Sequence, residues 1–263
     1  MKKAIFVVLV VLLLGVFLFS GWKVITALRD YKAGETFYEQ MEAFISEPET
    51  EETQSKETER TQKETTGEKS KTLAWPKVDF AALHAINPDV VGWIYFPDTQ
   101  MNYPVLQGDT NDEYIHTLMT GEFNNAGSIF LEAGLPSDFS AQNSVVYGHN
   151  MVNGTMFAEL AEGYRDQSYY EAHPYAMLLT PQGNYYVRIF SGYVIDIWSD
   201  AWKISFTDNE FAQWLQERVR LSYIETDVVP MPDDRIVTFS TCTDESHDMR
   251  FILHGVLEKW EEE

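Results

Sequence analysis

An uninterrupted apolar run near the N-terminus constrains this chain more than any other feature. Residues 4–22 read AIFVVLVVLLLGVFLFSGW, nineteen positions without a charge. As a helix, this run is about 28 Å long, close to the hydrocarbon thickness of a bilayer. Lys2 and Lys3 precede it, which favours a cytoplasmic N-terminus and an exported remainder. No small-residue cleavage pattern follows the run, so we expect an uncleaved signal anchor in the cell membrane.

The segment after the anchor is strongly polar. Residues 46–71 contain no aliphatic or aromatic side chain, so nothing there offsets the entropy of ordering the backbone. We therefore predict a flexible spacer, whose root-mean-square length as a coil is about 28 Å. The expected organisation is a cytoplasmic tip and transmembrane anchor (1–22), a juxtamembrane segment with an acidic linker (23–76) and a catalytic domain (77–263).

Charge and cysteine content exclude several classes of function. The chain carries 19 basic and 41 acidic side chains, and its formal charge is −22. Phosphate backbones repel such a chain, so we expect no nucleic-acid partner. A single cysteine excludes a disulfide framework and a cysteine-based zinc finger. No histidine pair with metal spacing, calcium loop or Gly-rich phosphate cradle is present, so we expect neither metal nor cofactor.

Short apolar runs separated by Pro, Asp, Asn and Gly predict a mainly antiparallel β domain from Val90 to Leu257. The turn chemistry of residues 181–184, PQGN, predicts a hairpin. A short helix over residues 78–86 should end at Asn87-Pro88. The predicted strands are 90–96, 103–107, 127–131, 144–147, 175–180, 185–196, 235–242 and 250–257.

One longer helix is predicted between the hairpin and the last strand pair. Residues 207–210, TDNE, fit a capping box at its start. Its apolar residues then recur at helical spacing and should pack on the sheet. They are Phe211, Trp214, Leu215 and Val219.

The single thiol lies where a sheet could present it. Cys242 ends the strand RIVTFSTC, and Arg250 opens the next strand, so a hairpin would bring the two together. A buried, inert thiol is one interpretation, because free cysteine is among the most buried residue types. An unpaired thiol in an exported protein instead favours use as a nucleophile. A nucleophilic cysteine needs a nearby cation and a proton donor, and a guanidinium also suits an oxyanion. A surface salt bridge is the alternative role for Arg250.

Histidine is the natural proton donor, and spacing alone leaves three of the six histidines open. His149 ends the run SVVYGH, in which we expect Gly148 to permit an unusual backbone. His247 lies in the loop after Cys242, and His254 shares a strand face with Arg250.

Three motifs together resemble class B sortases, the membrane-anchored cysteine transpeptidases of Gram-positive bacteria. They are NPDVVGWIYFPDT (87–99), NSVVYGHNM (143–151) and RIVTFSTC (235–242) followed by Arg250. The resemblance covers about residues 78–260. It implies a closed eight-stranded β-barrel with N-terminal helices and a long helix inserted before the cysteine strand. It also implies that His149, Cys242 and Arg250 converge at one end of the barrel.

The resemblance further implies a thiol-protease-like acyl transfer outside the cell. The Cys242 thiolate attacks the threonine carbonyl of a C-terminal sorting motif in a surface protein, Arg250 stabilises the oxyanion, and His149 protonates the departing amine. An amine on a cell-wall peptide or a lipid-linked precursor then resolves the thioester. The expected substrate groove consists of Asn111, Ile115, Ser240 and Thr241, for which loop or core roles remain open.

Some features depart from this family or favour other functions. The loop after Cys242, TDESHDM, is acidic and lacks an aromatic residue, which bears on motif preference and opposes thiolate formation. An L,D-transpeptidase is disfavoured because its Ser-His-Gly-Cys pattern is missing. A pilus-building sortase is disfavoured because the chain ends in LEKWEEE rather than a second apolar span. The remaining alternative is a membrane-tethered binding or scaffold domain with an inert cysteine.

Overall fold

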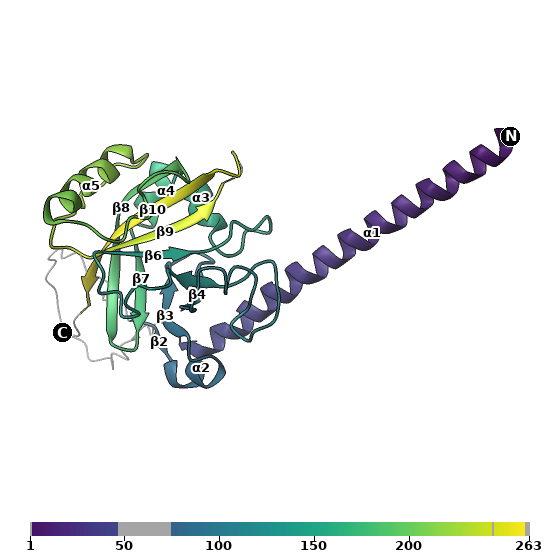
Figure 1. Ribbon diagram of the computed structural model, residues 1–263. Coiled ribbons are helices and arrows are strands. Elements are labelled where there is room, and N and C mark those ends of the chain that lie inside the picture. The colour runs from purple at the N-terminus through teal and green to yellow at the C-terminus, as the bar shows by residue number, and fades with distance from the viewer. Residues whose placement is uncertain (1, 47–74, 244, 261–263) are drawn as a thin grey trace, which may run out of the picture.

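A closed β-barrel with one long projecting helix forms the protein (Figure 1). The computed structural model describes residues 2–46, 75–243 and 245–260. Within these residues, eight strands close in the order β10-β8-β7-β3-β4-β5-β6-β9. They are β3 (Val90–Tyr95), β4 (Asn102–Leu106), β5 (Ile129–Leu131), β6 (Asn143–Tyr147), β7 (Tyr175–Thr180), β8 (Gly183–Asp196), β9 (Ile236–Cys242) and β10 (Met249–Lys259). The predicted eight-stranded barrel is confirmed.

Two of the strand pairs are parallel, although the other pairs among the described residues are antiparallel. The parallel pairs are β4 with β5 and β6 with β9. A parallel pair cannot be closed by a tight turn, so long connections leave the barrel at these places. Because β6 and β9 run in the same direction, the residues that follow both strands emerge at the same end of the barrel. This arrangement brings the segment after Tyr147 next to the end of β9.

Helices occupy the long connections. The predicted inserted helix is α5 (Asp208–Leu221), and its capping box is present, with the Thr207 N–H donating to Glu210 Oε2 at 2.9 Å. Two short helices that the sequence analysis did not predict, α3 (Ala158–Gly163) and α4 (Gln167–Ala172), follow β6. The helix before the barrel, α2 (Phe80–Ile86), starts at Asp79, whose side chain accepts from the Ala82 N–H.

The face of α5 that packs on the barrel differs from the prediction at two positions. Phe211, Trp214 and Leu215 are buried against Phe190 and Ile236 of the barrel. Val219, expected on this face, is 46% exposed, and the side chain of Arg218 is only 2% exposed. Arg218 lies one helical turn after Trp214, so the helical repeat places it on the buried face.

A buried cation is tolerated at Arg218 because several groups face it. Its Nη2 donates to the Asp200 carboxylate at 2.9 Å, and its guanidinium lies over the rings of Tyr193 and Trp214. Cation–π contacts and one ion pair offset part of the desolvation cost. The same cluster includes His254, which is fully buried and hydrogen bonded to the Tyr193 and Thr238 hydroxyls.

The long N-terminal helix, α1 (Lys2–Met41), runs without interruption through the predicted boundary at residue 22. It is long and apolar enough to cross a membrane, and its first half is exposed in Figure 1. Its last residues pack on the barrel, where Tyr38 and Met41 are each 6% exposed. A 3₁₀ turn, η1 (Glu42–Phe44), follows.

A short antiparallel pair, β1 (Ile45–Ser46) with β2 (Lys77–Val78), brings together the two ends of the acidic segment. Apart from Ser46, the predicted spacer at 46–71 lies outside the described residues. The residues of α1 that pack on the barrel precede this segment in the sequence.

The buried neutral His254 makes stability depend on pH. Burial, reinforced by the Arg218 guanidinium, holds the pKa of His254 well below its usual range. Below about pH 6.5 the unfolded chain binds a proton that the folded protein excludes, so stability is lost as pH falls. We predict that His254→Gln reduces the decline in unfolding free energy between pH 7 and pH 5 by up to about 1.4 kcal/mol per pH unit. Urea unfolding at several pH values measures it. The exposed His247→Gln should keep the wild-type slope, and equal slopes in all three proteins would contradict the assignment.

Candidate active site

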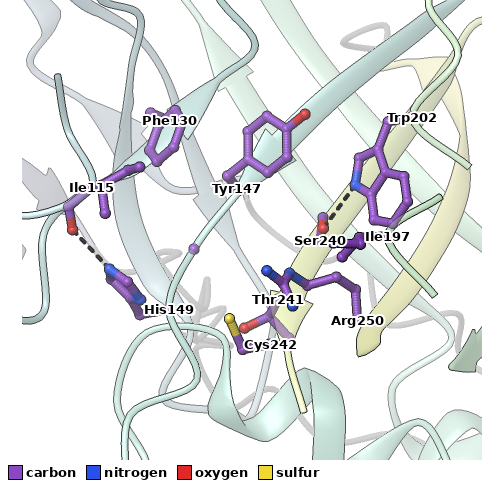
Figure 2. A pocket seen from close by; sticks show the side chains of 11 residues that line it. Ile115, Phe130, Tyr147, His149, Ile197, Trp202, Ser240, Thr241, Cys242 and Arg250 are labelled. Carbon is purple, nitrogen blue, oxygen red and sulfur yellow. Dashed lines mark hydrogen bonds between the residues drawn. The ribbon is translucent and has the colours of Figure 1, made fainter. Parts of the chain in front are cut away.

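A cavity of about 380 Å³ opens at the end of the barrel where β6 and β9 finish (Figure 2). Residues from six separate stretches of sequence form its wall. They are Ile115, Phe130, Tyr147, Gly148, His149, Ile197, Trp202, Ser240, Thr241, Cys242 and Arg250. The three residues predicted to carry the chemistry therefore line one cavity, although 101 positions separate the first from the last.

Cys242 and Arg250 face the cavity from neighbouring strands. Cys242 is the last residue of β9, and Arg250 lies directly opposite it in the antiparallel ladder with β10. Directly opposed residues place their side chains on the same face of a sheet. Figure 2 shows the sulfur of Cys242 between the Arg250 guanidinium and the His149 ring. The cysteine is free and exposed, as a nucleophile must be.

The guanidinium of Arg250 is held by the loop between β9 and β10. Its Nη1 donates to the carbonyls of His247 and Met249 at 2.8 and 2.9 Å. No carboxylate among the described residues forms an ion pair with it. Its other N–H groups can therefore donate to a substrate oxygen in the cavity. The acidic loop is partly neutralised, because Glu245 pairs with Arg165 at 2.8 Å.

His149 emerges two residues after β6 and is oriented by the loop that precedes β5. Its Nε2 donates to the Ile115 carbonyl at 2.7 Å, and a carbonyl can only accept. Nε2 therefore carries a proton, and Nδ1 is the nitrogen that can accept and release another. The His116 ring stacks on the His149 ring, with centroids 5.2 Å apart and planes inclined by 9°.

Burial sets the charge of His149. It lowers the pKa of His149 below its ordinary value, the Ile115 carbonyl raises this pKa in part, and His116 lowers it. At neutral pH the imidazole is therefore mainly uncharged and can act as a base. The two other histidines left open by spacing lie elsewhere, since His254 is buried beside α5 and His247 is exposed in the β9–β10 loop. Of these three histidines, His149 alone lines the cavity that contains Cys242.

The four residues predicted for a substrate groove do not share one environment. Ile115, Ser240 and Thr241 line the cavity. Asn111 stands outside its wall, where its amide donates to Glu132 at 2.5 Å and accepts from the Ala133 N–H at 2.7 Å. The buried Thr241 hydroxyl has no hydrogen-bond partner among the described residues, whereas Ser240 Oγ accepts from Trp202 Nε1 at 2.9 Å.

Sequence analysis did not name Phe130 or Tyr147 as wall residues, although both lie on predicted strands. It also missed Ile197 and Trp202. Both lie between β8 and α5, in a segment with no periodic pattern and no recognisable motif. Two hydrogen bonds to its backbone hold the segment. Trp214 Nε1 donates to the Asp200 carbonyl and Asn143 Nδ2 donates to the Lys203 carbonyl. Among the described residues, no group of three or more His, Cys, Asp or Glu side chains could hold a metal ion.

Known proteins are similar in sequence to this chain over most of its length. Residues 94–258, which include every residue of the cavity wall, match the family model of the sortase domain. The chain is 33% identical over 254 residues to sortase B of Listeria monocytogenes serovar 1/2a, which covers 95% of both chains. It is 36% identical over 176 residues to sortase B of Staphylococcus aureus, which covers 66% of this chain and 72% of that one.

Solved structures of sortase B have a similar fold. A Staphylococcus aureus sortase B–substrate complex superposes with a TM-score of 0.66 at 36% identity, covering 69% of this chain and 85% of that chain. Clostridium perfringens sortase B superposes with a TM-score of 0.64 at 29% identity, covering 68% of this chain and 100% of that chain.

Gly148 keeps His149 in place through its lack of a side chain. The φ of Gly148 is not positive, so a left-handed backbone is not the reason for a glycine here. Instead, a Cβ there would lie 2.4 Å from Ile129 Cδ1 and 2.7 Å from Phe157 Cδ2, and both side chains are fully buried. We predict that Gly148→Ala costs about 1–3 kcal/mol of stability and lowers turnover, because the added methyl displaces the strand end before His149.

Thermal unfolding and peptide cleavage by the same preparation measure both effects. Gly15→Ala in the exposed apolar half of α1, where a Cβ meets nothing within 4 Å, is the control and should change neither. A Gly148→Ala protein with wild-type stability and turnover would show that the close approach is unimportant.

Proposed function

The chain belongs to the sortase family as a class B sortase, a cysteine transpeptidase, and on that premise we propose that Cys242, His149 and Arg250 carry its reaction. The observation that supports this proposal most directly is the cross-strand pair of Cys242 and Arg250 facing His149 in one cavity. Nucleophile, oxyanion donor and proton carrier then line a single open cavity.

In the proposed first step, the neutral His149 ring takes the thiol proton of Cys242 at Nδ1. The thiolate adds to the threonine carbonyl of a sorting motif, and the carbonyl π electrons move onto oxygen. Arg250 donates N–H bonds to that oxyanion, and a preorganised cation at this position stabilises the charge as it develops.

In the second step, the tetrahedral intermediate collapses. The oxyanion re-forms the carbonyl, the bond from threonine to the next residue breaks, and His149 returns its proton to the departing amine. The surface protein is left as a thioester on Cys242. An incoming amine then attacks the thioester and gives a proton to His149. The new amide bond forms as the C–S bond breaks, and His149 passes the proton to the departing thiolate. The cysteine and histidine end in the states in which they began.

The proposed partners follow from the reaction and from α1. The donor is a surface protein with a C-terminal sorting motif, and the acceptor is an amine on a cell-wall peptide or a lipid-linked precursor. The apolar half of α1 supports a single-pass anchor in the cell membrane. Lys2 and Lys3 at its start support a cytoplasmic N-terminus and an extracellular catalytic domain.

Peptide turnover tests the proposed nucleophile. We predict that the wild-type protein cleaves a fluorogenic sorting peptide and, with an added amine, forms the ligated product. Cys242→Ala should lose both activities to background, because no other thiol exists in the chain. Thermal unfolding of the variant should match wild type, since the side chain is exposed. Activity retained by folded Cys242→Ala would sink the proposed mechanism. A wild-type protein inactive on several motif peptides would favour the scaffold interpretation.

The oxyanion role of Arg250 predicts that charge alone is insufficient. Arg250→Lys keeps the positive charge, but an ammonium cannot hold the His247 and Met249 carbonyls and also reach the oxyanion with a planar fork. We predict a fall in kcat of roughly 100-fold or more, the size of effect seen when one oxyanion donor is removed. Steady-state kinetics measures it, with Arg165→Lys at the exposed Glu245 ion pair as the control. Near-normal turnover in Arg250→Lys would remove Arg250 from this role.

A further inference from the structure

We propose that the end of α1 outside the apolar segment, residues 30–41, positions the active site by fixing the two loops that hold His149. This inference rests on the function proposed above, because it assigns residues that act through His149. None of these residues lines the cavity. Its influence is carried by contacts that can be followed from side chain to side chain.

The first of the two loops, residues 114–128, is the last part of the connection from β4 to β5. It supplies the Ile115 carbonyl that accepts from His149, and the His116 ring that stacks on His149. The loop is folded back on itself, since Thr117 and Phe123 form an isolated antiparallel bridge and Ser128 N–H donates to the Tyr114 carbonyl. A shift of this loop therefore moves both groups that orient the imidazole.

The end of α1 is hydrogen bonded to this loop at two residues, Asp30 and Tyr38. Asp30 accepts at its carboxylate from the backbone and side chain of Asn125, at 3.1 and 2.6 Å, and at its carbonyl from Asn124 Nδ2 at 2.9 Å. Two turns later, the buried Tyr38 hydroxyl donates to the Gly127 carbonyl. Between them, Gly34 lets the helix approach, because a Cβ there would lie 2.8 Å from Asn124 Oδ1.

The second loop, residues 149–157, is reached through Tyr103. The Tyr38 ring packs edge-on against the Tyr103 ring, with centroids 5.2 Å apart. The Tyr103 hydroxyl in turn accepts from the Met156 N–H at 3.0 Å. Met156 has a positive φ of 59°, which a non-glycine residue adopts only when its surroundings hold it there. The next residue, Phe157, donates its N–H to the His149 carbonyl at 2.8 Å.

Because of these contacts, removing a hydrogen bond between α1 and the loops should change the pKa of His149. The charged and titratable groups that face His149 across the cavity or against its ring are His116, Tyr147, Cys242 and Arg250, and Tyr147 is bonded to Glu132. None of them is on α1. Loosening the loops admits water to the imidazole, which removes part of the desolvation that lowers its pKa. The acidic limb of kcat/KM, which reports the neutral base, then moves to higher pH.

The test uses the full chain in detergent or nanodiscs. Asp30→Ala removes the carboxylate that accepts from Asn125, and Tyr38→Phe removes the hydroxyl while keeping the ring on Tyr103. Rates are normalised to active sites titrated with a thiol reagent, so a loss of folded protein does not count. We expect kcat to fall by roughly 3- to 30-fold in each, since small misplacements of a catalytic group are costly. We expect the acidic limb to rise by about half a pH unit.

Two matched variants sharpen the outcome. Asp30→Asn keeps an oxygen that can accept from Asn125 and should recover most of the rate. Glu39→Ala removes an exposed carboxylate from the same helix and should behave as wild type. Equal losses in Asp30→Asn and Asp30→Ala, or a lower melting temperature with an unchanged acidic limb, would overturn the positioning role. Failure of the proposed function looks different, because wild type would then be inactive or Cys242→Ala active.

Discussion

The proposed chemistry depends on one rung of the ladder between β9 and β10. Cys242 and Arg250 are opposed there, so the proposed nucleophile at the end of one strand and a permanent cation near the start of the next share a face of the sheet. A register shift of one residue would turn one of them away from the cavity. The closed barrel prevents such a shift, because β9 and β10 are each bonded to a second neighbour, β6 and β8. Closure of the barrel therefore also fixes Cys242 and Arg250 opposite each other.

The third group comes from a different part of the chain, and the parallel pairing of β6 with β9 delivers it. His149 needs a fixed ring, a protected face and a free nitrogen. The loop before β5 supplies the first two, through the Ile115 carbonyl and the His116 ring, and leaves Nδ1 available. Burial keeps the imidazole uncharged at neutral pH. The resting site then combines a neutral base with the charge of Arg250, an arrangement suited to stabilising negative charge that appears only during the reaction.

Local patterns in the sequence were sufficient for the eight strands, for the capping box at Thr207 and for the motifs around His149 and Cys242. They could not supply what depends on distant contacts. Burial of Arg218 is invisible in a hydrophobic pattern, because Asp200 and two aromatic rings compensate its charge only in the fold. Trp202 lies in an aperiodic segment, and the packing of Tyr38 on the barrel is hidden in a helix that resembles a plain anchor. Parallel pairing likewise joins strands that are far apart in sequence.

The central claim is that an acyl group passes through the sulfur of Cys242, and mass spectrometry of the protein tests it most directly. Incubation with a sorting peptide in the absence of an acceptor amine, followed by acid quenching and peptide mapping, should show the acyl fragment ending in threonine on the peptide that contains Cys242. Addition of an amine should remove that mass and yield the ligated product. An adduct on any other residue would contradict the account. It would also be contradicted if the ligated product formed faster than the Cys242 adduct forms and decays.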